Sequence, residues 1–171
     1  MAGPPAPAPL PASPLRLERW QAVDPERYRR LFRRVGERWL WFSRLVMDDA
    51  KLMAEVAEVH AVLGEAGEEA GLVELDFRQP GECLIRFLGL VPELAGQGHG
   101  RWLFQATLNL AWRPDVARVR VHTCTLDHPA ALPAYLRAGF RAYARAFESF
   151  PDPRLAGLLP RDAAPHVPLL G

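Results

Sequence analysis

The sequence predicts an α/β (α+β) single domain with a mixed, mostly antiparallel central sheet flanked by helices. The chain has 171 residues, which suits one domain, and 49% of them are apolar, which is enough for a full core. Helical and strand-like periodicities alternate along the chain. Three consecutive strand-like segments in the middle are joined by short, glycine-containing connections, which favour an antiparallel meander.

Proline-rich segments occupy both ends of the chain. Residues 1–14 hold six prolines and are predicted to be a lead-in without regular structure. Residues 151–171 are predicted to be a proline-rich tail that wraps the surface, which leaves 15–150 as the folded domain. The start lacks a signal-peptide pattern, and no window reaches the roughly 18 apolar residues of a membrane helix. We therefore expect a cytoplasmic protein without a membrane partner.

The first third of the chain predicts one strand and two helices. Residues 15–23 alternate apolar and polar side chains, as a half-buried strand does. A helix follows, with Asp24 as its cap and Pro25 in its first turn, and it ends near Gly36. Its predicted apolar face consists of Tyr28, Leu31, Phe32 and Val35. An aromatic run over 38–47 then leads to a short helix at 48–57.

The rest of the chain is richer in strands. Its predicted strands cover 58–66, 70–78, 82–91, 117–126 and 140–150. Its predicted helices cover 100–112 and 128–139. Pro133 lies inside the second of these helices, which indicates a kink or a later true start.

Charge and cysteine content narrow the function classes. The net charge is +1, but nine arginines face only four acids between Arg16 and Arg44. A solvated helix face explains this excess, and a docking surface for a nucleic acid or an acidic protein is the alternative. No nucleic-acid-binding module accompanies it, so we expect no nucleic-acid partner.

The chain has two cysteines. Cys83 and Cys124 lie in apolar runs and are predicted to be buried free thiols in a reducing compartment.

The stretch "LAGQGHGRWLF" (94–104) is the most informative motif. It places three glycines at alternate positions where a strand gives way to a helix. The first amides of a helix lack internal partners, and glycines let a phosphate approach them closely. The stretch therefore predicts a pyrophosphate cradle, with a tight turn as the plain alternative. The cradle would consist of Gly96, Gln97, Gly98, His99, Gly100 and Arg101. A dinucleotide fingerprint and a P-loop fit the spacing less well.

Two motifs together resemble the GNAT superfamily of N-acetyltransferases. The family carries R/Q-x-x-G-x-G/A between a strand and a helix, and residues 95–100 match both glycines, with Ala95 at the leading position. The family also has Asn, a Tyr seven residues later, and then Gly-Phe. Here "HPAALPAYLRAGF" supplies His128, Tyr135 and Gly139-Phe140 at these positions. The resemblance spans about residues 15 to 150.

The resemblance implies acetyl-CoA as the donor and a small-molecule or peptide amine as the acceptor. It places the pantetheine arm along Leu88, Gly89 and Leu90, with an N–H near Leu90 or Val91 stabilising the thioester oxygen. It also adds His128 to the cofactor-binding residues. No metal is expected, since His122, Cys124 and His128 are only a weak metal signal. The resemblance leaves a homodimer open.

Tyr135 is the catalytic residue that the resemblance implies, as the general acid for the leaving thiolate. The alternative is a helix residue packed under the sheet. The general base stays open: Thr123 occupies the position where some members carry a glutamate, and a hydroxyl cannot serve. His122 is adjacent but should point to the opposite face of the strand, and Glu82, His60 and His128 are the other candidates. A water chain, or an amine that is already partly neutral, would serve instead of a base.

The aromatic run "RWLWFSRL" borders the acceptor site if the resemblance holds. Trp39, Trp41 and Phe42 would shape an apolar acceptor pocket, with Arg38 or Arg44 reading a carboxylate; core packing is the alternative. The sequence therefore predicts an N-acetyltransferase that works by direct attack in a ternary complex. A catalytically silent acyl-CoA-binding module of the same fold is the second hypothesis.

Overall fold

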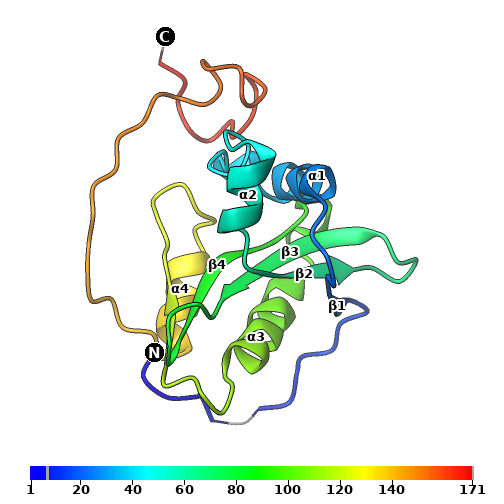
Figure 1. The fold of residues 1–171 in the computed structure, drawn as a ribbon, viewed down its shortest axis with the longest axis vertical. Helices are drawn as coiled ribbons and strands as arrows, with labels where there is room; N and C mark the ends of the chain where they lie inside the picture. Colours follow the sequence, from blue (N-terminus) through cyan, green and yellow to red (C-terminus); the bar gives the residue numbers. More distant parts are fainter. Residues whose placement is uncertain (7, 171) are drawn as a thin grey trace.

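The computed structural model describes residues 1–6 and 8–170, so positions 7 and 171 of the predicted lead-in and tail lie outside it. Its strands are β1 (Arg16–Arg19), β2 (Glu58–Leu63), β3 (Glu69–Asp76), β4 (Glu82–Leu90) and β5 (Arg118–Val121). Its α-helices are α1 (Pro25–Gly36), α2 (Asp49–Glu55), α3 (His99–Ala111) and α4 (Ala131–Arg137). Two short 3-10 turns are η1 (Glu37–Trp39) and η2 (Pro92–Leu94). Figure 1 shows their arrangement.

The five strands form one mixed sheet in the order β1-β2-β3-β4-β5. The first three pairings are antiparallel, and β4 pairs with β5 in parallel through the crossover helix α3. This arrangement confirms the predicted mixed, mostly antiparallel sheet and the meander in its middle. Pro133 falls in the first turn of α4, where a proline is tolerated, so the helix starts later than predicted.

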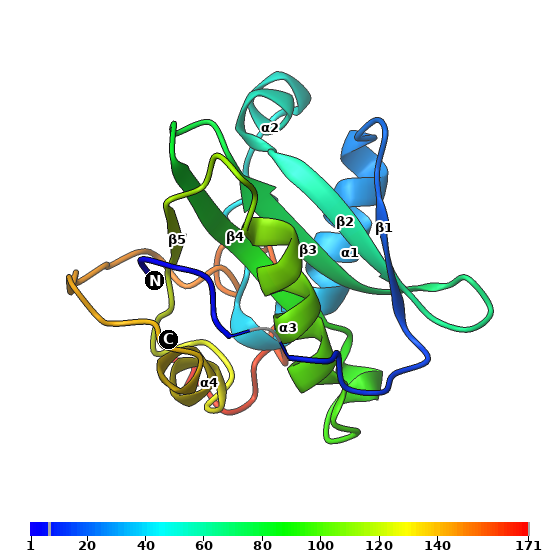
Figure 2. The ribbon, with the colours of Figure 1, turned by 90° about the horizontal axis from the view of Figure 1, so that it is seen from below.

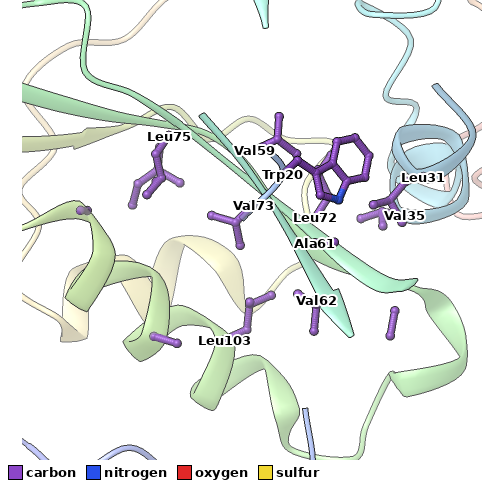
Figure 3. Packing of buried hydrophobic residues seen from close by; sticks show 14 of the residues in the cluster. Trp20, Leu31, Val35, Val59, Ala61, Val62, Leu72, Val73, Leu75 and Leu103 are labelled. Atoms are coloured by element: carbon purple, nitrogen blue, oxygen red, sulfur yellow. The ribbon is translucent and has the colours of Figure 1, made fainter. Parts of the chain in front are cut away.

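Helices cover both faces of the sheet, with α1 on one side and α3 on the other (Figures 1 and 2). Leu31 and Val35 of α1 approach the sheet from one face, and Leu103 of α3 approaches it from the other (Figure 3). All four apolar residues predicted for α1 are buried, since the 3.6-residue period places them on one stripe. The side chain of Asp24 caps the helix by accepting from the Arg27 N–H at 2.6 Å.

Strands β4 and β5 diverge, and this divergence positions the site. Their register runs only from Glu82 opposite Arg118 to Ile85 opposite Val121. Strand β5 ends there, whereas β4 continues to Leu90 and stays paired with β3 on its other side. The carboxyl half of β4 therefore has an open edge, which parallel strands in a closed sheet do not leave.

The prediction of a strand over residues 140–150 is wrong. The Phe140 N–H donates to the Tyr135 carbonyl, which ends the turn after α4. The next residues, 141–150, are exposed and extended and belong to no strand (Figure 1). Met1 occupies part of the outer edge of β5, where its terminal amine and carbonyl bond to Val119 at 2.7 and 3.0 Å. The segment also carries three alanines, which offer little apolar surface to a sheet. An alternating pattern becomes a strand only where a partner edge is available.

The tail folds on itself rather than running free. Arg154 is buried and donates to the carbonyls of Ala163 and Val167 at 3.1 and 2.9 Å, while Asp152 balances its charge at 2.7 Å. Leu159 and its neighbours pack on Leu40, which forms a second, smaller core. The tail therefore lies against the loop that follows α1.

Candidate functional site

A cavity of about 1140 Å³ opens where β4 leaves β5, bordered by the start of α3 and by α4. Nine of the predicted site residues line it: Leu88, Gly89, Leu90, Gly96, Gly98, Gly100, Arg101, His128 and Tyr135. The structure thus brings together residues that are up to 47 positions apart in the sequence, from Leu88 to Tyr135.

The backbone of β4 offers hydrogen-bonding groups to this cavity. The Val91 N–H donates to the Ala70 carbonyl at 3.0 Å, so Val91 faces β3. Successive residues of a strand direct their N–H and C=O groups to opposite sides. Leu88 and Leu90 therefore present theirs to the open edge. Of the two predicted amide donors, the Val91 amide is already engaged, and the Leu90 amide is the one that faces the cavity.

Gly89 differs from its two neighbours. Its carbonyl faces Gly71 of β3, so its polar backbone groups belong to the sheet. A Cβ at this position would lie 2.6 Å from Val35 Cγ1 and 3.3 Å from Trp41. Gly89 therefore lets α1 and the Trp41 ring approach the strand closely, and of these three residues only Leu88 and Leu90 direct their backbone groups to the open edge.

The glycine stretch forms a turn whose amides point outward. Gly96 and Gly98 have φ angles of +77° and +84°, a region that glycine occupies without strain. Gly98 is the N-cap of α3 and uses no side-chain cap. Within the described chain, the N–H groups of Gly98, His99 and Gly100 have no acceptor. Three unsatisfied amides at a helix start form a site suited to an anion.

Two predicted cradle residues turn their side chains away from the cavity. The Gln97 amide donates to the Glu93 carbonyl at 2.9 Å. His99 Nδ1 pairs with Ser13 Oγ at 3.1 Å, which ties the lead-in segment to the start of α3. Gln97 and His99 are not among the lining residues, so only their backbone can take part in the cradle.

Tyr135 lines the cavity from α4. Its ring packs against Phe104 and Phe140, with centroids 5.3 and 5.9 Å away. Burial, with a smaller contribution from the negative charge of Asp127, raises the pKa of Tyr135 to about 12. The phenol therefore keeps its proton throughout the neutral range.

His128 fixes the start of α4. Its Nδ1 accepts from the Ala130 N–H at 3.0 Å, and its ring lies edge-on to Trp39 at 5.2 Å. An Asn side chain makes the same short-range bond to the backbone two residues on. His128 therefore does locally what the expected Asn would do, and it lines the cavity as well.

The sequence profile described as "Acetyltransferase (GNAT) family" matches residues 15–140 of this chain. The chain belongs to the GNAT family. No curated protein is a significant match to it.

Solved structures show the same GNAT fold at low sequence identity. An aminoglycoside acetyltransferase from an uncultured soil metagenomic sample, in complex with sisomicin, has a TM-score of 0.57 and 18% identity over 80% of this chain and 95% of that one. Aminoglycoside N-acetyltransferase AAC(6')-Iy, in complex with CoA, has a TM-score of 0.55 and 12% identity over 80% and 94%. IAA acetyltransferase from Bacillus cereus has a TM-score of 0.56 and 17% identity over 76% and 79%.

The sequence did not point to the carboxylate that this GNAT chain places in the cavity. Thr123, which cannot be a base, donates its hydroxyl to Asp127 Oδ2 at 2.7 Å, and Asp127 lines the cavity. Two of the proposed bases lie elsewhere: Glu82 pairs with Arg118 and Arg120, and the buried His60 pairs with Glu58. Asp127 lies in the loop between β5 and α4, and no local sequence motif marks it. Its place in the cavity wall is visible only in the structure.

The aromatic run borders the cavity of this GNAT domain and also packs in its core. Trp41 contacts Phe32 and Phe87 with centroids 5.4 and 5.0 Å away, and it lines the cavity as well. Arg44 is buried in an ion pair with Glu74 at 2.7 Å, so it cannot read a ligand carboxylate. Arg38 is exposed, lines the cavity and has no ion-pair partner among residues 1–6 and 8–170.

The two cysteines differ in their exposure. Cys83 is buried and burial raises its pKa to about 12, but Cys124 is exposed, which corrects the prediction that both thiols are buried. Across the described residues, His, Cys, Asp and Glu side chains form no group of three suited to a metal ion. The described helices include none with the length and apolar character required to cross a bilayer.

Proposed function

We propose that this protein transfers an acetyl group from acetyl-CoA to a primary amine by direct attack in a ternary complex. One observation supports this most strongly. The open edge of β4 and the unsatisfied amides at the start of α3 line the same cavity. An extended thioester arm needs backbone partners along its length, and a pyrophosphate needs a helix start. The two features occur side by side.

The Leu90 amide is the proposed oxyanion donor. It faces the open edge, whereas the Val91 amide is held by Ala70. As the amine attacks, charge develops on the thioester oxygen, and a preorganised N–H at this point stabilises that charge by a few kcal/mol. Leu88 holds the arm through the same edge of the strand, and Gly98, His99 and Gly100 hold the pyrophosphate through their amides.

Tyr135 is the proposed donor to the leaving sulfur. With a pKa of about 12, its phenol is a weaker acid than an ordinary thiol, whose reference pKa is about 8.5. Tyr135 therefore stabilises the developing thiolate through its O–H hydrogen bond and keeps its own proton, and the released thiolate takes its proton from solvent.

A catalytically silent acyl-CoA-binding module is the second candidate. Ala95 and His128 depart from the family motifs, and Thr123 stands where some members have an acid. The two candidates share the cofactor site and differ only in turnover.

Thermal unfolding with acetyl-CoA, CoA and ATP tests the shared part. A ligand at about 100 times its dissociation constant adds roughly 2.7 kcal/mol to the folded state. We expect both CoA species to raise the melting temperature and ATP to leave it unchanged. Release of free thiol from acetyl-CoA with a panel of primary amines then tests turnover. Binding without turnover would favour the silent module, and no shift at millimolar ligand would contradict both candidates.

A further inference from the structure

Asp127 is held firmly at the wall of the cavity by its own loop. Thr123 Oγ1 donates to its Oδ2 at 2.7 Å, and the Cys124 N–H donates to the same oxygen at 3.0 Å. The Asp127 N–H in turn donates to the Cys124 carbonyl at 3.2 Å. A carboxylate fixed in this way has lost most of its rotamer freedom before any ligand arrives.

The carboxylate is only half used by these contacts. Both loop bonds reach Oδ2, and among the described residues Oδ1 has no hydrogen-bond donor. Asp127 is half-buried, and no cation of the described chain lies within ion-pair distance of it, whereas Glu58, Glu74 and Asp76 pair with arginines. The loop bonds engage Oδ2 alone, so Oδ1 and the negative charge are available to a ligand in the cavity.

Asp127 and Tyr135 line the same cavity, and the negative charge of Asp127 contributes to the raised pKa of the Tyr135 phenol. Glu148, His122 and His128 also line this wall. Glu148 and His122 are exposed, and among the described residues neither makes a hydrogen bond that orients it. His128 accepts from a backbone N–H through Nδ1. Orientation therefore favours Asp127 as the group that faces a bound amine.

We propose that the Asp127 carboxylate binds the acceptor amine through Oδ1 and accepts its proton during transfer; this inference rests on the proposed function. The neutral amine donates an N–H to Oδ1, and its lone pair attacks the thioester carbon. The new C–N bond forms, the C–S bond breaks, and the electron pair leaves on sulfur. The proton of the now cationic nitrogen passes to Asp127, while the Tyr135 hydroxyl donates a hydrogen bond to the leaving thiolate, which takes its proton from solvent. Thr123 is the positioning residue.

Asp127→Asn is the variant that tests this inference, because Asn retains an oxygen for the Thr123 and Cys124 donors and removes the charge. The acceptors are 2-phenylethylamine, tryptamine and butylamine. We expect kcat/KM for the amine to fall about 100-fold or more, within the range of general-base contributions. The affinity for CoA and the melting temperature should stay unchanged. Thr123→Val should raise KM for the amine more than it lowers kcat. Asp115→Asn, on an exposed loop outside the cavity, is the matched control and should keep wild-type rates.

The outcomes separate this inference from the function on which it rests. Unchanged turnover in Asp127→Asn, or a loss with Glu148→Gln in its place, would overturn the role of Asp127 and leave the acetyltransferase proposal intact. A wild-type protein that binds CoA and acetylates none of the amines would overturn both.

Discussion

The Tyr135 phenol shows how burial changes the chemistry of a single side chain. Packing between Phe104 and Phe140 keeps its proton in place and also makes it a poorer acid than in water. In the proposed reaction, a phenol of this pKa would donate a hydrogen bond to the leaving sulfur rather than give up its proton. The motif that identified Tyr135 in the sequence carried no information about this balance.

Tyr135→Phe tests the role of the hydroxyl without disturbing the packing. Phenylalanine keeps the ring contacts, so the melting temperature and the affinity for CoA should stay close to wild type. The O–H is lost, so kcat should fall about 100-fold, as for the loss of one donor to a charge that develops in the transition state. Steady-state kinetics with 2-phenylethylamine and acetyl-CoA measure this. Tyr143→Phe, which removes an exposed hydroxyl bonded to Arg120, is the control. A kcat equal to wild type would remove Tyr135 from the mechanism.

Residue types and spacing could predict the glycine loop and Tyr135, because both depend on short-range pattern. They could not predict the proposed role of Asp127, since Asp127 is on a loop that lines a cavity formed by distant elements. They also could not exclude Arg44, whose partner Glu74 lies 30 residues away.

At the scale of elements, the start of α3 combines two glycines with different roles. Gly98 needs a positive φ to cap the helix, whereas Gly100 lies within the helix and a Cβ there would meet nothing within 4 Å. Gly100 is therefore not required by the fold. The proposed pyrophosphate cradle gives Gly100 a role, because a side chain there would stand where the anion approaches.

The pair Gly98→Ala and Gly100→Ala separates the turn from the cradle. Gly98→Ala should destabilise the protein by about 1–2 kcal/mol, because alanine is strained in the left-handed region. Gly100→Ala should stabilise it by up to about 1 kcal/mol, since alanine is the better helix former, and should still weaken CoA binding at least tenfold. Urea unfolding without ligand and calorimetric titration with CoA measure the two effects. If Gly100→Ala bound CoA with wild-type affinity, the loop would be a turn and not a cradle.

Helices and strands were predicted well where the sequence pattern of their own residues is enough to define them. The apolar stripe of α1 and the apolar runs of β2 and β3 mark residues that are buried in the structure. The segment 140–150 also has a strand-like pattern, but a strand needs an edge to pair with, and no local signal reports one.

At the scale of the whole molecule, tertiary pairing absorbs much of the basic excess in the first third of the chain. Arg27 pairs with Glu69, Arg34 with Glu93 and Arg29 with Asp49. These acids come from β3, η2 and α2, far along the sequence. The solvated-face interpretation of the arginines therefore gains support over a docking surface, because fewer of the charges are left for a partner.

The exposed segment 141–150 and the folded tail beyond it should differ sharply in their resistance to trypsin. Arg141 and Arg145 lie in extended, exposed backbone, which fits easily into a protease cleft. Arg154 is the internal control: it is 3% exposed, and neighbouring carbonyls and Asp152 hold its guanidinium. Brief digestion followed by mass spectrometry should therefore show first cuts after Arg141 and Arg145 and none after Arg154. The double variant Arg141→Gln/Arg145→Gln should lose these early cuts. Protection of both sites, with earlier cleavage after Arg154, would show that 141–150 is paired in solution and that the tail is the loose part.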